Sequence, residues 1–341
     1  MAGVLKIADA ADLLDRSFNK IMLKEVPVKT YYDKMYNVRK GITDLYTKES
    51  GLSEYAEAAR TIENGTIIAD VPVQTFDQTY EQVFYDIMGG FSKKMWKFGI
   101  KKNDLTRVAQ GLKKAIHRHR ERLLAHKYDA AYLSSYTESD RRGNYTVTVT
   151  GGDGSPMATA SHTREDGGTA WTNVNSDGTT TNMNLDYPGL KGMARIGGLM
   201  VDPRGNPMPM EYNRIVVKLG SNAAFRAKEI KRALKEGKIP GEFSHDGAAV
   251  GDFELVENPY LLGTGDATST TNLSSATNWH AIATEELSDT CGPQYLESEG
   301  ISVEGPNIVF KTDEIQFKAG SGFTYGHNDA RCTAHAQGDN S

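Results

Sequence analysis

The stretch that decides the fold is residues 103–135, which read NDLTRVAQGLKKAIHRHRERLLAHKYDAAYLSS. Its apolar residues recur every three or four positions, the spacing of one helix face: Leu105, Val108, Leu112, Ile116 and Leu123. Asn103 or Asp104 can cap the start, and no proline interrupts the pattern. At ~1.5 Å per residue such a helix is roughly 50 Å long, far above the usual length. We therefore predict a structural spine helix over 103–135.

Positive charge is concentrated around this helix. Between Lys93 and Lys127 there are twelve Lys or Arg residues and two acidic residues, a net charge of +10. Because the whole chain carries −5, the remainder must carry −15. This segregation indicates a face directed toward nucleic acid or toward an acidic neighbour, and the alternative is an ordinary solvated helix face. The cations expected on that face are Lys113, Lys114, Arg118, Arg120 and Arg122.

The segments before the spine favour extended structure that needs a partner. Residues 66–100 contain β-prone patches, which predict two long strands joined at a polar tip, 77–81. A hairpin with no third strand is marginal alone, so another subunit is its natural partner. Residues 28–65 are rich in Tyr and lack periodicity, which favours an arm lying on other surfaces. A short amphipathic helix is expected within 4–22.

The rest of the chain predicts mixed elements, so the fold class is α+β. Strands are expected at 145–149, at 214–219, near 251–262 and repeatedly within 301–334. A helix is expected over 223–235, capped by Ser221 or Asn222. A loop rich in Gly, Ser, Thr and Asn occupies 151–184, and 263–278 is expected to be a second, flexible loop.

Composition restricts the class of protein. The chain has 341 residues, 38% of them hydrophobic, and a mean hydropathy of −0.50. Such a polar chain has modest cores and much surface, which suits a protein that packs against neighbours. No run of about 18 apolar residues is present, so no membrane span is expected. Residues 1–39 do not resemble a signal peptide, and with only Cys291 and Cys332 we predict a reducing compartment and two free thiols.

Residues that could carry catalytic or metal chemistry do not form a recognisable site. His117 and Glu121 have the i, i+4 spacing of zinc ligands, and His119 and His126 lie nearby. However, no third ligand has fitting spacing and the neighbours are cationic. The Gly-rich segments 263–266 and 320–322 lack the Lys of a phosphate-binding loop and the spacing of a dinucleotide motif. We therefore expect no enzyme activity, no cofactor and no metal.

One stretch resembles a known family. Residues 153–162 read DGSPMATASH, and they are followed by Gly167-Gly168 and Asn173. Major capsid proteins of Mu-like and related tailed phages carry a similar motif between the spine helix and the next domain. Here Met157 and Ala158 stand where Leu-Phe is more usual, and no proline follows the histidine. Further segments resemble the family in the same order, namely 202–207, 214–217, 258–261, 279, 292–293 and 323–331, so the likeness spans roughly 60–335.

The resemblance implies a Hong Kong 97-type capsid fold. It implies an N-terminal arm at 1–65, an extended β-hairpin loop at 66–100, a peripheral domain at 101–185 and 313–341, and an axial domain at 186–312. The arm and loop would contact neighbouring subunits through Tyr31, Tyr32, Tyr36, Phe76, Tyr80, Phe84 and Trp96. Some family members cross-link this loop through a Lys-Asn bond. No partner Asn or catalytic Glu can be assigned here, so no cross-link is predicted.

The function implied is that of a major head protein of a tailed phage. Hexamers and pentamers would assemble in the bacterial host cytoplasm into an icosahedral shell, the capsid of the virion, around double-stranded DNA. Portal and scaffolding proteins, and optionally a decoration protein, would be its partners. An encapsulin-like nanocompartment of the same fold is the alternative, and a surface adhesin, suggested by 144–184, is opposed by the missing signal peptide. Deleting 72–96 should leave a foldable subunit that forms no stable shells.

Overall fold

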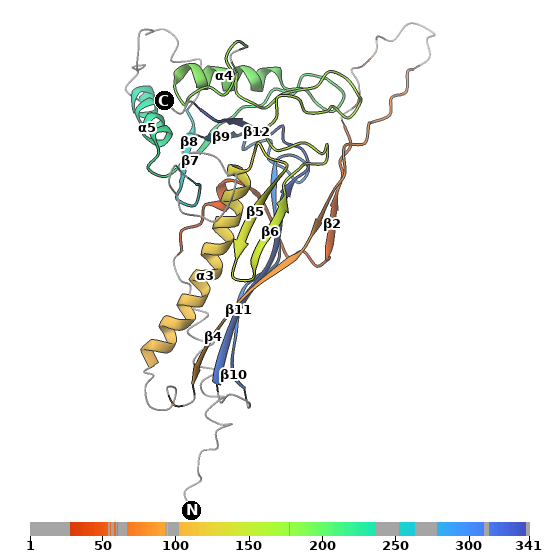
Figure 1. Ribbon diagram of the computed structural model, residues 1–341. Coiled ribbons are helices and arrows are strands. Elements are labelled where there is room, and N and C mark those ends of the chain that lie inside the picture. Colours follow the sequence, from red (N-terminus) through yellow and green to blue (C-terminus); the bar gives the residue numbers. More distant parts are fainter. Residues whose placement is uncertain are drawn as a thin grey trace, which may run out of the picture.

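The computed structural model describes residues 28–53, 55, 58, 60, 67–92, 94, 102–176, 178–235, 252–262, 278–309 and 314–338. Figure 1 shows an elongated α+β molecule in which one long helix lies along a sheet, and a second sheet with two helices lies at one end. The predicted helix within 4–22, Trp96 and nearly all of the loop 263–278 lie outside the described residues. No helix in the described part is both long and apolar enough to cross a membrane.

The predicted spine exists as helix α3, Lys102–Asp129, and it ends six residues earlier than expected. Backbone bonds from Ala131 to Tyr128 and from Leu133 to Ala130 form a tight turn. The chain then enters the hairpin of β5, Ser135–Asp140, and β6, Gly143–Thr148, which confirms most of the strand predicted at 145–149. From Leu123 to Ala131 nearly every residue is buried, most of the apolar ones in the main core. The apolar residues therefore continue past the end of the helix, which is why the sequence predicted a longer one.

The first sheet lies against the spine. Its strand order is β1, Asn37–Lys40, then β10, Pro293–Val309, then β11, Glu314–His327, then β4, Val83–Ser92. β1 is parallel to β10 and the other pairs are antiparallel. Leu112 and Ile116 of α3 pack on Ile315 and Phe317 of β11, which explains the apolar stripe of the spine. A short 3-10 helix, Tyr32–Lys34, packs beside α3.

The second sheet has the order β12, Thr333–Ala336, then β9, Trp279–Ile282, then β7, Arg214–Lys218, then β8, Glu254–Asn258. Helices α4, Tyr187–Leu199, and α5, Asn222–Lys235, share a core cluster with Ile215 and Val217 of β7. Ser221 accepts a hydrogen bond from the Ala224 amide at 3.1 Å, so the predicted cap is confirmed.

Helix α4 was not predicted, because four of its thirteen residues are glycines, which are poor helix formers. Three of these glycines, Gly189, Gly192 and Gly197, permit close approach. A Cβ on Gly197 would lie 2.1 Å from the Met210 carbonyl oxygen, and one on Gly192 would lie 2.5 Å from Asn175 Oδ1. The local signal that was available is Asp186, which accepts a hydrogen bond from the Gly189 amide at 2.8 Å and caps the helix.

Sheet membership differs from the predicted domain boundaries. Strand β12 lies within 313–341, assigned to the peripheral domain, yet it pairs with β9 of the second sheet. Strand β10 lies within 186–312, assigned to the axial domain, yet it pairs with β1 and β11 of the first sheet. Both pairings cross the predicted boundaries for one reason: a sequence pattern identifies a strand but not its distant partner.

The hairpin predicted within 66–100 is not formed by the described residues, and an extended pair that begins earlier in the chain is present instead. Strand β2, Tyr46–Glu49, pairs antiparallel with β3, Gln78–Glu81, and Leu52 bridges to Gln74. The outgoing strand therefore lies in the predicted arm, and the predicted polar tip is the returning strand. Strand β4 does not belong to this hairpin, because it pairs along its whole length with β11. Deleting 72–96 would remove an integral strand of the first sheet, so our expectation of a foldable subunit is wrong.

Candidate assembly surfaces

The described residues of the extended hairpin (45–53, 55, 58, 60 and 67–81) expose large apolar side chains. Ile67 is 86% exposed, Ile68 76% and Val71 75%. Leu45, Tyr46, Leu52 and Tyr55 are also exposed. A patch of this kind on a soluble chain marks a surface that another protein covers. The local signal was the pair Ile67-Ile68, which places apolar side chains on both faces of an extended segment.

Three of the predicted contact residues are instead buried within this chain. Tyr32, Tyr36 and Tyr80 are 6%, 2% and 3% exposed, so they have almost no surface for a neighbour, and that prediction is corrected. Tyr36 donates a hydrogen bond to the Leu124 carbonyl at 2.7 Å and thus anchors the arm to α3. The aromatic residues of this segment complete the core of the subunit. Tyr31 and Phe76 are half-buried, and Phe84 is 58% exposed on β4.

A turn at 202–206 contacts the returning segment of the hairpin at Asp70. The Asp202 carboxylate accepts hydrogen bonds from the amides of Arg204, at 2.9 Å, and Asn206, at 2.7 Å. Gly205 has φ +89°, a conformation that favours glycine. The Arg204 guanidinium then contacts both carboxylate oxygens of Asp70, one of them at 2.8 Å. This turn is one of the segments whose sequence resembles the capsid family. It lies between α4 and β7, so it joins the hairpin to the part of the chain that carries the second sheet.

A groove of about 1050 Å³ lies between α3, β4 and the β5–β6 hairpin. Its walls include Tyr85, Ile116 and Phe323, and its rim carries exposed Arg118, Arg141 and Arg142. None of these three arginines forms an ion pair with another described residue. The hydroxyl of Tyr145, which also lines the groove, is buried without a hydrogen-bond partner in the described chain. The groove thus has apolar walls, and its exposed edge carries three arginines together with Asp86 and Asp140.

The predicted cationic face of the spine is only partly accessible. Lys114 and Arg118 are exposed, whereas Lys113 and Arg122 are half-buried, and Arg122 pairs with Glu138 at 3.1 Å. Arg120 is 4% exposed and pairs with Glu297 of β10 at 3.1 Å. Its guanidinium also lies 4.5 Å from the ring centre of Tyr32. Arg120 therefore joins the spine to the sheet, and its assignment to an outer face is wrong.

Glu121 is a buried carboxyl beside this pair. Burial raises its pKa to about 7, although the backbone amides of Tyr31 and Tyr32, both at 3.3 Å, and the charge of Arg120 oppose the shift. The opposition is weak because the Arg120 guanidinium is directed toward Glu297. Burial therefore favours the neutral form of the Glu121 carboxyl group, and this group changes its protonation state near pH 7.

Substituting Glu121 by glutamine should remove this pH dependence. The folded-state pKa is raised, so the stability that Glu121 contributes is present below pH 4.5 and is lost as pH rises through 7. Glutamine does not titrate and its oxygen can still accept from the two amides. Relative to the unchanged protein, E121Q should gain up to about 3 kcal/mol in unfolding free energy between pH 4.5 and pH 8. Urea unfolding at both pH values measures this, and a pH-independent difference would contradict it.

The family-like motif and the closing strand segment form one buried network. The His162 ring stacks on Trp171 at 4.0 Å and lies between Asp153, at 2.8 Å, and Asn173, at 3.2 Å. Arg331 covers the Trp171 ring at 4.8 Å. Its guanidinium pairs with Glu165, at 2.9 Å, and with Asp329, at 2.6 Å. These residues fix the long loop 151–176 to the segment before β12, which is a structural role.

No metal-binding arrangement is found in the described ranges, where no group of three or more His, Cys, Asp or Glu is placed to hold an ion. The histidines considered for zinc have other partners. His126 Nδ1 lies 2.7 Å from Glu138, and His117 lies 3.3 Å from the Arg120 guanidinium. Burial, with the charges of Arg120 and Lys113, lowers the pKa of His117 to about 4.

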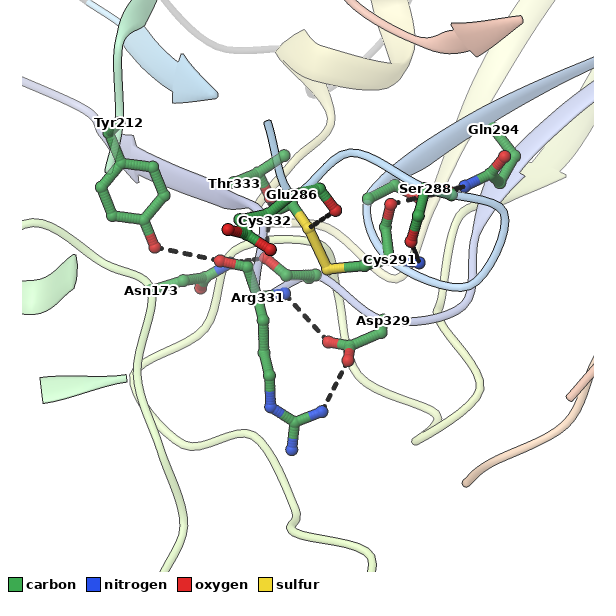
Figure 2. Close-up of a disulfide and its surroundings, with 12 residues drawn as sticks. Asn173, Tyr212, Glu286, Ser288, Cys291, Gln294, Asp329, Arg331, Cys332 and Thr333 are labelled. Atoms are coloured by element: carbon green, nitrogen blue, oxygen red, sulfur yellow. Dashed lines mark hydrogen bonds and ion pairs between the residues drawn. A yellow bond between two sulfur atoms is a disulfide. The ribbon is translucent and has the colours of Figure 1, made fainter. Parts of the chain in front are cut away.

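Cys291 and Cys332 form a disulfide, so the prediction of two free thiols is wrong (Figure 2). Their Cα atoms lie 6.0 Å apart, although 41 positions separate them in the sequence. The approach depends on pairing between distant segments, since Cys291 bridges in parallel to Asp329. Spacing along the chain alone could not show it.

Comparison with known proteins places this geometry among capsid structures. No protein-family model matches the chain, and no curated protein matches it either. A chain of the capsid of an empty GTA particle matches with a TM-score of 0.51 and 9% identity, over 92% of each chain. A chain from Mycobacterium phage Adephagia matches with a TM-score of 0.48 and 11% identity, over 99% of each chain. The capsid of Myoviridae phage XM1 follows with a TM-score of 0.47 and 10% identity, over 99% of this chain and 100% of that one. The likeness to the first of these shows the fold: the chain has the Hong Kong 97-type fold of phage capsid proteins, as the sequence resemblance implied.

Proposed function

We propose that this chain is the major capsid protein of a tailed bacteriophage. Hexamers and pentamers would build an icosahedral shell around double-stranded DNA, assembled in the host cytoplasm and retained in the virion. Portal and scaffolding proteins, and a decoration protein where the phage has one, would be its partners. The observation that carries the proposal is the capsid fold combined with a long hairpin that exposes Ile67, Ile68 and Val71. In an isolated subunit these apolar side chains would remain exposed to water.

The hairpin and the groove have complementary chemistry. In the sequence, residues 44–70 carry six acidic residues against Lys48 and Arg60, and two of the six, Glu49 and Asp70, pair with arginines of the same chain. The segment also includes several apolar side chains. The groove has an apolar interior and a rim with Arg118, Arg141 and Arg142. We infer that the hairpin of one subunit occupies the groove of its neighbour. Opposite charges would fix the register, and apolar burial would supply most of the free energy.

Assembly then works by repetition. Each contact between subunits can be weak, because every subunit makes the same contacts with several neighbours and the closed shell forms them together. Lys113 and Lys114 lie outside the groove lining, so they are the candidates for contacts with packaged DNA. Such contacts would neutralise phosphates without reading sequence.

Electron microscopy of the full chain, expressed alone and with its neighbouring phage genes, tests the proposal. Closed shells or rings of subunits are the expected result. A persistent monomer under both conditions would contradict it. Small shells that co-purify with a cargo enzyme would instead support the encapsulin-like alternative.

A further inference from the structure

The disulfide lies where the two sheets meet. Cys291 comes two residues before β10 of the first sheet, and Cys332 immediately precedes β12 of the second. Figure 2 shows the bond beside the Arg331–Asp329 pair, close to Glu286 and Ser288. The bond therefore joins the segment 283–292, which connects β9 to β10, to the segment 328–332, which connects β11 to β12.

The backbone holds the two cysteines in place independently of the bond. The Gly292 amide donates to the Asp329 carbonyl at 2.8 Å, and the Ala283 amide donates to the Cys332 carbonyl at 2.9 Å. Gly292 also has φ +89°, and a Cβ on it would lie 3.3 Å from the Cys332 Cβ and 2.4 Å from Leu287. The chain therefore leaves room for the sulfurs, and the Cα separation of 6.0 Å is suitable for a disulfide.

The same site can also accommodate two thiols. The Sγ of Cys332 lies 3.1 Å from the Glu286 carbonyl oxygen. A disulfide sulfur has no proton to donate, whereas a thiol in this position can donate to that oxygen. The buried thiol would therefore have a hydrogen-bond acceptor already in place. The surroundings are compatible with both oxidation states.

We propose that Cys291 and Cys332 form a reversible redox lock between the two segments that connect the sheets. The pair would remain as thiols in a reducing compartment and would close when the folded chain meets a small disulfide such as oxidised glutathione. Closure after release from the host cytoplasm rests on the proposed function. The redox reaction itself does not.

The exposure of the two cysteine residues sets the order of the steps. Cys291 is 8% exposed and Cys332 is fully buried, so the Cys291 thiolate attacks the small disulfide and releases one small thiol. The Cys332 thiolate then attacks the Cys291 sulfur of the mixed disulfide and releases the second. Two protein thiols lose two protons and two electrons, and one small disulfide becomes two thiols.

The full chain, equilibrated with reduced or with oxidised glutathione, tests the lock. Denaturation in the presence of N-ethylmaleimide, followed by intact mass, should show two adducts per chain in the reduced sample and none in the oxidised one. The oxidised protein should melt about 5 °C higher. The matched double variant Cys291→Ala/Cys332→Ala should melt at one temperature in both buffers, close to that of the reduced protein.

Two adducts per chain in the oxidised buffer would overturn the proposal, and so would equal melting temperatures of the unchanged protein in both buffers. If the double variant does not fold, the unchanged protein in the two buffers still decides the question. Electron microscopy of the reduced sample measures shell formation separately from the oxidation state of the cysteines. A failed lock and a failed capsid function are therefore distinguishable.

Discussion

Replacing Arg331 by methionine should destabilise the subunit by about 3–5 kcal/mol, the largest loss expected from a single substitution in this chain. The Arg331 side chain is 1% exposed and pairs with Glu165, which is 5% exposed, and with Asp329. Methionine fills much of the same volume, but it leaves two carboxylates partly or wholly buried without their counter-charge. The lost contact with the Trp171 ring adds to this cost. Urea unfolding of the purified subunit measures the effect.

Two further variants define the cause. Arg141→Met changes an exposed arginine that has no ion pair with another described residue, so its effect should stay within about 0.5 kcal/mol. Glu165→Gln in the R331M background should recover part of the loss, because one uncompensated buried charge is removed. If R331M and R141M unfold at the same urea concentration, the network does not have the structural role assigned to it.

Replacing the three most exposed apolar residues of the hairpin should abolish shell formation without unfolding the subunit. The variant is Ile67→Ser/Ile68→Ser/Val71→Thr. These side chains are at least 75% exposed in the single subunit, so their loss should change its unfolding free energy little. The same side chains are expected to be buried between subunits, where each contributes on the order of 1–2 kcal/mol. Because the contact repeats in every subunit, the loss should eliminate shells.

A conservative variant of the same positions is the control. Ile67→Val/Ile68→Val/Val71→Ile retains the apolar surface and should assemble. Negative-stain microscopy and sedimentation compare the two variants at equal concentration. Normal shells from the Ser/Ser/Thr variant would show that this patch is not an assembly contact.

Local patterns in the sequence predicted local structure well. The apolar spacing from Val108 to Leu123 predicted α3, and Ser221 predicted the start of α5. Both depend on neighbours within a few positions. Helix α4 was missed because its glycines serve close packing against Asn175 and Met210, contacts that a propensity argument cannot include.

Features that depend on distant partners were predicted less well. The strand character of 83–92 was visible, but its partner β11 lies more than 200 positions later, so a local hairpin was the simpler interpretation. Arg120 was expected at the surface because arginine usually is, and Tyr36 because it lies in a Tyr-rich segment without periodicity. Their burial follows from Leu124 and Glu297, which only the fold brings close. The disulfide was missed for the same reason.

The pairing of β1 with β10 has a consequence for synthesis. Asn37 and Gln294 lie side by side although 257 positions separate them. The ribosome must therefore complete most of the chain before the first sheet can close, and until then the spine lacks the strands on which its apolar stripe packs. A nascent chain of this kind is exposed to aggregation while it waits. The same delay prevents a half-made subunit from joining a growing shell, because the groove wall formed by Phe323 does not exist until translation is nearly finished.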